Sequence, residues 1–398
     1  MKRWLRMRRV LPLVFAAACA CALWVTFWTP SPNVTPAPDR STCCGSNPAN
    51  GAVRAQDAAP RPAHAPRASP VARWRVPFSA RPTPPRAAGD GWIVADEAGG
   101  VTALDADGAV RWRASCSNQA FEAAAAVSDG TVVVAARGGG VTAVRHADGD
   151  VMWSRMTGGM FLRAPRTGTV GGVPAVWLVS QADGRLFCLR IRDGELIWSG
   201  EPTNRCDGEP VVAQGRIAYG NCDGAVYLFD AATGAARGKI EIGTEDQMAG
   251  GLLALSDGRL IGGTRRGHLV AVDPDAMKVV GRAAVAESEA FATPVVAFGG
   301  EIATGTPEGE VVFCRWADDG MQVTGRVGLG TSEVSELAFV DGCLLALCGG
   351  ELCLLTPPQN VAARIALGDD VYGLEVNAQG TVVCVADQAV VCVRGVGR

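Results

Sequence analysis

Residues Gly130–Arg155 read GTVVVAARGGGVTAVRHADGDVMWSR, and this stretch decides the fold of the chain. It contains a Val-rich segment, a Gly-rich turn, a second alternating segment, an Asp-Gly turn and a last segment that carries Trp153. Related text occurs before it at Gly91–Ala114 (GWIVADEAGGVTALDADGAVRWRA) and after it at Ala175–Gly200 (AVWLVSQADGRLFCLRIRDGELIWSG). Self-similarity at a fixed period indicates an array of equal supersecondary units.

Alignment on the glycine of the first turn predicts eight such units. The turn residues are Gly99, Gly139, Gly184, Gly224, Gly267, Gly309, Gly349 and Gln388, at spacings of 40, 45, 40, 43, 42, 40 and 39 residues. Mostly small residues stand four positions before the turn residue: Ala95, Ala135, Ser180, Gly220, Gly263, Gly305, Leu345 and Cys384. A similar set stands four positions after it: Ala103, Ala143, Cys188, Leu228, Ala271, Phe313, Cys353 and Cys392. We expect neighbouring sheets to pack closely at both sets of positions.

One further strand precedes each unit, as at Glu209–Ala213 (EPVVA) and Thr293–Ala297 (TPVVA). Four short strands at a period near 40 residues predict an all-β fold, an eight-bladed β-propeller of four-stranded blades. The eighth unit stops where its last strand should begin, whereas Val71–Val76 (VARWRV) resembles Ala109–Ala114 (AVRWRA). The sequence therefore predicts that an N-terminal strand carrying Trp74 closes the ring from the other end of the chain.

These repeats resemble the pyrroloquinoline-quinone-type repeat. The likeness rests on Ala143-x4-Asp148-Gly149-x3-Trp153 and Ala103-x-Asp105-x2-Gly108-x3-Trp112. Leu228–Gly234 (LFDAATG) matches the Asp-x-x-Thr-Gly part of the motif but has no Trp after it. The motif weakens in units five to eight, where Gly281, Thr324 and Arg364 lie near the Trp position. The resemblance implies a quinoprotein dehydrogenase, a BamB-type factor of outer-membrane β-barrel assembly, or another binding propeller.

The N-terminal residues predict export. Five basic residues among residues 1–10 precede Leu11–Trp28, an uncharged apolar run that fits a retained membrane anchor with its basic side in the cytoplasm. A cleaved signal peptide, or a lipoprotein acylated at Cys19 or Cys21, remains an alternative. Residues 29–70 are rich in Pro and Ala and predict a disordered tether, which contains Cys43-Cys44. We therefore divide the chain into residues 1–28, 29–70 and a propeller over 71–398, outside the cytoplasm.

Composition limits the partners. The net charge of −3 provides no basic field for nucleic acid, although the chain has only three Lys against 34 Arg. The histidines His64, His146 and His268 have no metal-ligand spacing. The Gly-rich runs join strand to strand, so they predict turns and not phosphate loops.

Fourteen cysteines in an exported chain raise the question of disulfides. Several occupy positions that hold small or apolar residues in other units, which predicts burial as free thiols. Two pairs are placed to bond across hairpins: Cys206 with Cys222 around Gln214-Gly215, and Cys384 with Cys392 around Gln388. The first pair is the preferred candidate because it lies at strand ends, where strain is easier to absorb.

The sequence favours a non-enzymatic module that binds a protein partner in the cell envelope, with no cofactor. The alternative is a quinoprotein dehydrogenase that uses pyrroloquinoline quinone and Ca²⁺, which the resemblance associates with vicinal cysteines over the cofactor. Cys43-Cys44 lies before the first blade, however, and the blades are near minimal length. Acidic residues such as Glu245 and Asp246 at one mouth of the ring could supply ligands for Ca²⁺.

The binding prediction rests on connections that enter the inner strands, all of which lie on one face of an up-and-down ring. These connections carry acidic residues interleaved with aromatic and other large apolar ones, a mixture that suits a basic or mixed peptide surface. The residues expected to form the binding face are Phe121, Glu122, Phe161, Glu245, Asp246, Met248, Glu289, Phe291, Asp369, Asp370 and Tyr372.

Overall fold

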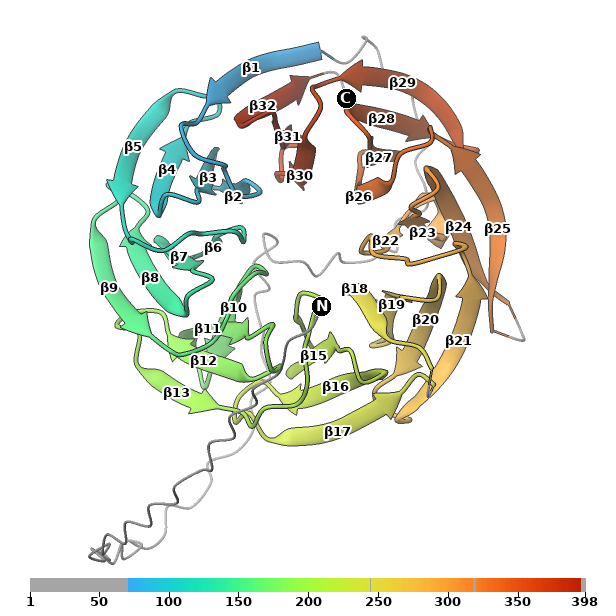
Figure 1. Ribbon diagram of the computed structural model, residues 1–398, viewed down its shortest axis with the longest axis horizontal. Helices are drawn as coiled ribbons and strands as arrows, with labels where there is room; N and C mark the ends of the chain where they lie inside the picture. Colours follow the sequence, from blue (N-terminus) through green and yellow to red (C-terminus); the bar gives the residue numbers. More distant parts are fainter. Residues whose placement is uncertain (1–70, 244, 318–319, 395–398) are drawn as a thin grey trace, which may run out of the picture. The chain divides into compact units, whose positions relative to one another are not determined.

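A computed structural model describes residues 71–243, 245–317 and 320–394. In these residues eight four-stranded antiparallel sheets follow one another around a ring (Figure 1). The predicted eight-bladed propeller is therefore confirmed. The predicted anchor, tether and Cys43-Cys44 lie outside the described residues. Within the described part of the chain, no helix has the length and apolar character needed to cross a bilayer.

Each blade runs from an innermost to an outermost strand. Blade 1 contains β2 (Arg86–Ala88), β3 (Gly91–Ala95), β4 (Gly100–Leu104) and β5 (Val110–Ser115). Blade 2 contains β6 (Ala126–Ser128), β7 (Thr131–Ala135), β8 (Gly140–Arg145) and β9 (Val151–Met156). Blade 3 contains β10 (Arg166–Val170), β11 (Val173–Val179), β12 (Leu186–Arg190) and β13 (Leu196–Ser199). Blade 4 contains β14 (Val211–Ala213), β15 (Arg216–Gly220), β16 (Ala225–Asp230) and β17 (Ala236–Glu241).

The second half of the ring repeats this order. Blade 5 contains β18 (Met248–Ala254), β19 (Leu260–Thr264), β20 (His268–Asp273) and β21 (Lys278–Ala284). Blade 6 contains β22 (Val295–Val296), the short 3₁₀ turn η1 (Phe298–Gly300), β23 (Ile302–Gly305), β24 (Glu310–Ala317) and β25 (Gly320–Gly328). Blade 7 contains β26 (Val334–Val340), β27 (Cys343–Cys348), β28 (Glu351–Thr356) and β29 (Asn360–Ala366). Blade 8 contains β30 (Val371–Val376), β31 (Val382–Ala386), β32 (Ala389–Arg394) and β1 (Val71–Pro77).

The N-terminal strand closes the ring as predicted. β1 pairs antiparallel with β32 from Val71↔Arg394 to Pro77↔Ala389, and Trp74 lies opposite Cys392. The two ends of the propeller thus share one sheet, and the last blade presents no unpaired edge at β32.

The turn glycines have the conformation that the alignment requires. All seven have positive φ, from +58° at Gly349 to +89° at Gly139, and Gln388 takes φ of +60° in the eighth unit. A Cβ at Gly309 would also lie 2.7 Å from the carbonyl carbon of Gly330 in the loop that leads to blade 7. Glycine is therefore favoured for both its backbone conformation and its lack of a side chain.

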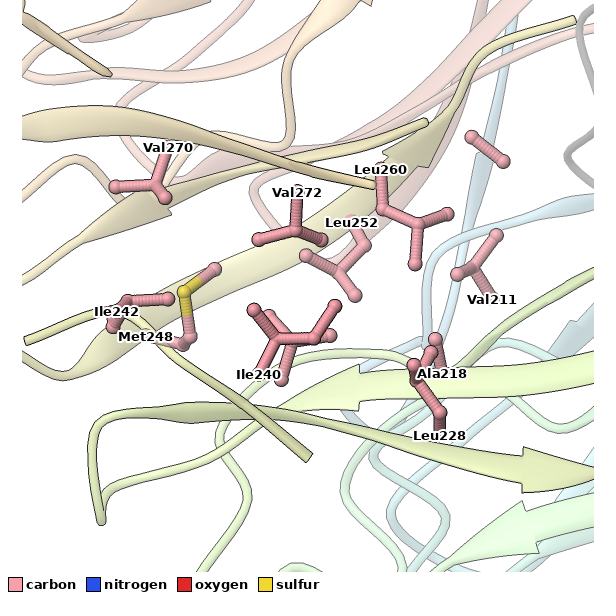
Figure 2. Packing of buried hydrophobic residues seen from close by; sticks show 12 residues of the cluster. Val211, Ala218, Leu228, Ile240, Ile242, Met248, Leu252, Leu260, Val270 and Val272 are labelled. Atoms are coloured by element: carbon pink, nitrogen blue, oxygen red, sulfur yellow. The ribbon is translucent and has the colours of Figure 1, made fainter. Parts of the chain in front are cut away.

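Apolar packing fills every interface between blades. The described residues form eight buried clusters, each shared by two neighbouring blades. Figure 2 shows the interface of blades 4 and 5, where Ile240 and Leu228 meet Leu252 and Val272. The core is thus divided into eight inter-blade layers, because each sheet buries its faces only against its neighbours.

Tryptophans join the outer rims of blades 8, 1, 2 and 3 to the following blade. We call the turn between the third and outermost strands of a blade its outer hairpin. Trp74, Trp112, Trp153 and Trp198 each lie on a glycine of the next blade's outer hairpin, namely Gly108, Gly149, Gly194 and Gly234. The first three indoles donate to a carbonyl of the same hairpin, at Ala106, His146 and Ile191, over 2.7–3.1 Å.

The contact reverses direction in blades 4, 5 and 6, where the motif weakens. The residues in register with the Trp position there are Gly238, Gly281 and Gly325. Each of these glycines faces a large side chain from the next blade's outer hairpin, contributed by Met277, Trp316 and Gln359 respectively. A large residue still meets a glycine at these interfaces, but the blade that supplies the large residue changes.

The predicted pairing of Cys384 with Cys392 is wrong by one residue. The hairpin turns between Asp387 and Gln388, so Cys384 pairs with Val391, and Cys392 pairs with Val383. A shift of one residue places a side chain on the opposite face of a strand. Cys384 therefore packs against blade 7 and Cys392 packs against blade 1, both as free thiols.

We expect Trp74→Ala to lower the free energy of unfolding by about 3 kcal/mol, because it removes a docked indole from the strand that closes the ring. Urea denaturation followed by circular dichroism measures this loss. Val71→Ala changes an exposed residue of the same strand and serves as the control, with an expected effect below about 0.5 kcal/mol. Equal midpoints for the two variants would contradict this role for Trp74.

Candidate binding face

One face of the ring collects the connections between blades. Because the strands of a blade alternate in direction, every connection from an outermost strand to the next innermost strand lies on the same side as the turns that carry the glycine column. We call this side the loop face. Its connections are residues 78–85, 116–125, 157–165, 200–210, 242–243, 245–247, 285–294, 329–333 and 367–370.

Three of the residues expected on the binding face are buried. Phe121, Phe161 and Met248 are at most 2% exposed and belong to the apolar clusters between blades 1 and 2, 2 and 3, and 4 and 5. Met248 is the first residue of an inner strand, whereas Phe121 and Phe161 lie in connections that turn inward and insert them between sheets. These three residues therefore stabilise the ring and contribute no surface to a partner.

Asp246 fixes the connection between blades 4 and 5 to blade 5. Its side chain is 6% exposed, and its Oδ2 lies 3.2 Å from Arg282 of blade 5. Its Oδ1 accepts hydrogen bonds from the backbone N–H groups of Gln247 and Arg266. The neighbouring Glu245 is exposed and pairs with Arg266 at 3.0 Å. Both carboxylates are thus committed to arginine or to backbone donors.

This commitment bears on the dehydrogenase alternative. A Ca²⁺ site needs several oxygen ligands that are free to face the ion, and carboxylates already paired with arginine do not fit that need. Across the described residues, no three His, Cys, Asp or Glu side chains are arranged to hold a metal. A cavity of about 10 Å³ lies between blades 4 and 5 near Gln214 and Gly258, which is room for roughly one water molecule.

Phe291 is the exposed aromatic residue of the loop face above blades 5 and 6. It is 37% exposed, and the guanidinium of Arg265 lies 5.4 Å from its ring centroid. Arg265 also bridges Asp207 and Glu289, each at 2.7 Å. Burial opposes ionisation of Asp207, but Arg205 and Arg265 outweigh it and lower its pKa. We call Asp207, Arg265, Glu289 and Phe291 the Phe291 cluster.

A second aromatic residue lies beside the closing strand. Arg81 covers the ring of Tyr372 at 4.4 Å and pairs with Asp370 at 2.5 Å. The Tyr372 hydroxyl donates to the Pro82 carbonyl, and burial raises the pKa of Tyr372 to about 12. Asp369 is exposed next to this group. This part of the expected face is accessible, but the contacts with Arg81 and Pro82 fix it to the loop that follows β1.

Arginines change the expected charge of the face. The acidic residues predicted for this face are paired with Arg81, Arg137, Arg265 and Arg266, which bind Asp370, Glu122, Glu289 and Glu245 and were not predicted. Three of these arginines stand one or two residues before the turn glycine Gly139 or Gly267, a position that alignment of the repeats could have shown. The loop face therefore carries paired acidic and basic side chains around Phe291 and Tyr372, and it is not an acidic surface.

Charged residues also line the inner wall of the ring. Arg86 of β2 pairs with Glu375 of β30 at 3.2 Å, and Arg166 of β10 pairs with Glu209 at 2.5 Å. Burial opposes ionisation of Glu209, but Arg166, Arg86 and Arg163 outweigh it and lower its pKa. Glu336 accepts the backbone N–H groups of Gly373 and Leu374, and its burial raises its pKa. These contacts join the inner strands of neighbouring blades.

The preferred disulfide does not form in this structure. Cys206 is buried between blades 3 and 4 and donates to the carbonyl of Gly208, whereas Cys222 donates to Asp207. Both are free thiols, and burial raises the pKa of Cys206 to about 12. The hairpin turns between Gln214 and Gly215, because Ala213 pairs with Arg216. The predicted symmetry around a single central residue is therefore wrong, as it is for Cys384 and Cys392.

Comparison with known proteins agrees with the repeat and the fold. The family model described as outer membrane protein assembly factor BamB matches residues 49–237. The crystal structure of BamB from Moraxella catarrhalis superimposes with a TM-score of 0.65 at 17% identity, over 82% of this chain and 97% of that one. No curated protein matches the chain in sequence.

A designed protein shares the same architecture. The crystal structure of the computationally designed Ika8 protein gives a TM-score of 0.66 at 16% identity, over 80% of this chain and 96% of that one. At this level of identity the structural matches establish the fold alone. Together with the family model, they confirm the predicted resemblance to BamB-like propellers of the pyrroloquinoline-quinone repeat type.

We expect Asp246→Asn to lower the free energy of unfolding by about 2–3 kcal/mol, because it leaves Arg282 without its buried partner. Asp369→Asn removes an exposed carboxylate of the same face and should change stability by less than about 0.5 kcal/mol. Thermal denaturation of both variants measures the difference. A loss of the same size in both variants would show that Asp246 does not stabilise the connection through Arg282.

Proposed function

We propose that this BamB-like propeller is a non-enzymatic module that binds a protein partner in the cell envelope through its loop face. The observation that carries the proposal is the Phe291 cluster, an exposed aromatic ring held in place by a guanidinium that is itself fixed by two carboxylates. Aromatic residues and arginines contribute a large share of binding energy at protein interfaces. The ordered surroundings of Phe291 also lower the entropy lost on binding.

The surrounding charges indicate the kind of partner. Glu287 and Glu333 are exposed on the connections that flank blade 6, and the ion pairs near Phe291 offer both signs of charge. Such a surface fits a partner with an apolar pocket surrounded by basic and mixed polar groups. Envelope or outer-membrane protein assembly is the role that the family description suggests for such a partner.

The location is part of the same proposal. The apolar run Leu11–Trp28 would hold the chain to the membrane and place the propeller outside the cytoplasm. A tether over residues 29–70 would then let the loop face reach a partner at some distance from the bilayer.

Phe291→Ala should weaken capture of the partner at least tenfold, as expected for an aromatic residue central to an interface. The immobilised full chain is incubated with detergent-solubilised envelope membranes, and bound proteins are quantified by mass spectrometry. Phe339→Ala is the matched control, because Phe339 is 39% exposed and stands near the far end of an inner strand. Capture that survives Phe291→Ala, or falls equally in both variants, would refute the proposed face.

We expect no dehydrogenase turnover when the purified protein receives pyrroloquinoline quinone, Ca²⁺ and primary alcohols. The reason is that Glu245 and Asp246 are committed to arginines and backbone donors. Dye reduction that depends on the cofactor tests this expectation. Turnover that Glu245→Gln abolishes, while Asp369→Asn leaves it intact, would replace the binding proposal with an enzymatic one.

A further inference from the structure

The closing strand β1 differs from the other seven outermost strands of the described ring. Each of those strands is joined to its own sheet by an outer hairpin, whereas β1 reaches β32 from the opposite end of the chain. Only pairing and side-chain contacts hold β1 in blade 8. β1 is therefore held in blade 8 by the same kinds of contact that would hold a separate peptide strand.

The groove that holds β1 has two walls. One wall is the edge of β32, whose residues Val390–Val393 are buried in the clusters on the two faces of blade 8 and pair with β1 through their backbone. The other is the outer hairpin of blade 1, where Gly108 has φ of +84° and would place a Cβ 2.6 Å from Trp74. If β1 leaves, an apolar strand edge and a glycine-lined seat become exposed together, which strongly favours their occupation by another strand.

Side-chain contacts make the groove selective for the sequence Arg-Trp-Arg. The Trp74 indole donates to the Ala106 carbonyl over 3.1 Å, and Arg73 pairs with Asp107. Arg75 donates to the carbonyls of Leu367 and Ala386 over 3.0 and 2.8 Å and pairs with Asp387. Three consecutive residues thus each have acceptors of matching geometry. A merely apolar strand would leave these acceptors unused.

The segment after β1 permits the strand to move. The connection to blade 1 is fixed from Arg81 onward by the contacts of Arg81 with Asp370 and of Thr83 with Ala95. Between β1 and Arg81 lie Phe78, Ser79 and Ala80, of which Phe78 donates its N–H to Gln388. A hinge at Ser79-Ala80 would release β1 from blade 8 without disturbing blade 1.

We propose that this groove is a strand-exchange site and that its alternative occupant is β1 of a second copy of this chain. Reciprocal exchange reproduces in each ring the pairing of β1 with β32 and the contacts of Arg73, Trp74 and Arg75. The contact energy is therefore the same in the monomer and the dimer. The equilibrium is then set by the protein concentration and by the hinge, as in other exchanges of an identical element. The second copy is the best-matched occupant, because it carries Arg73-Trp74-Arg75 in the required register.

Two complementary variants of the full chain in detergent test the exchange. Trp74→Ala removes the donor and keeps the groove, whereas Gly108→Ala blocks the groove and keeps the donor. Each variant alone should be a destabilised monomer. An equimolar mixture should form a heterodimer, at least tenfold enriched over either homodimer by light scattering, with a melting transition above that of both components.

Trp112→Ala and Gly149→Ala provide the matched control, because they break the same contact where a hairpin ties the outer strand to its own sheet. This pair should show no complementation. Mass and melting curves of the test mixture that equal the average of its components would overturn the proposal.

A second measurement applies if either variant does not fold. A fluorescent peptide covering Val71–Phe78 is incubated with the wild-type full chain, and its incorporation is followed by anisotropy. Exchange is supported if an excess of unlabelled peptide prevents incorporation of the fluorescent one. An unlabelled peptide with Trp74→Ala should not prevent it. An absence of incorporation after partial unfolding and refolding in the presence of the peptide would contradict it.

Discussion

The ring depends on one contact, a large side chain seated on a glycine at the outer rim of each of seven interfaces between blades. A propeller blade buries its faces only against its two neighbours, so the rotation from blade to blade must be fixed locally. The apolar clusters fill the space between the sheets at every interface. An indole over Gly149, hydrogen-bonded to the carbonyl of His146, fixes both the distance and the orientation of the next blade.

This constraint explains why the repeat weakens in sequence while the structure stays regular. In blades 4 to 6 the tryptophan position holds glycine, and the next blade's hairpin supplies Met277, Trp316 or Gln359. The pair is conserved in space with its direction reversed, so no motif written for one strand can detect it. Blade 8 has no outer hairpin, so the remaining interface, between blades 7 and 8, has no equivalent glycine to receive a side chain. Arg364, which stands at the Trp position of blade 7, donates instead to the carbonyl of Leu329 in the connection between blades 6 and 7.

The sequence was sufficient for the architecture because its signals were backbone requirements. A glycine with positive φ, such as Gly99 or Gly139, indicates a tight turn between two strands. The missing last strand of the eighth unit requires a strand from the other end of the chain. Side-chain direction was harder to predict. Phe121 lies in a connection and Met248 starts an inner strand, yet both side chains turn inward between sheets. The cysteine pairs failed because their hairpins turn between two residues. The arginines beside Glu122 and Glu289 come from other segments of the chain, and the one sequence signal for them is their shared position two residues before a turn glycine.

The same rigidity shapes the proposed function. Phe291, in the connection 285–294, and Tyr372, at the start of β30, are each held by an arginine that is itself fixed by a carboxylate, so the proposed binding face is ordered before a partner arrives. In a binding propeller the residues of the loop face determine specificity, and the buried core provides stability. The closing strand is the exception, because it is held by contacts alone.

The most direct test of this account is a double-mutant cycle on Gly281 and Trp316, measured as free energies of unfolding. Gly281 does not have positive φ, so a Cβ there acts through its contacts, 3.0 Å from the Trp316 ring and 3.3 Å from Cβ of Met321. The account predicts that Gly281→Ala destabilises the wild type by about 1–2 kcal/mol and costs at least about 1 kcal/mol less when Trp316 is already alanine. Equal losses in both backgrounds would contradict the claim that a side chain seated on a glycine sets the geometry of the ring.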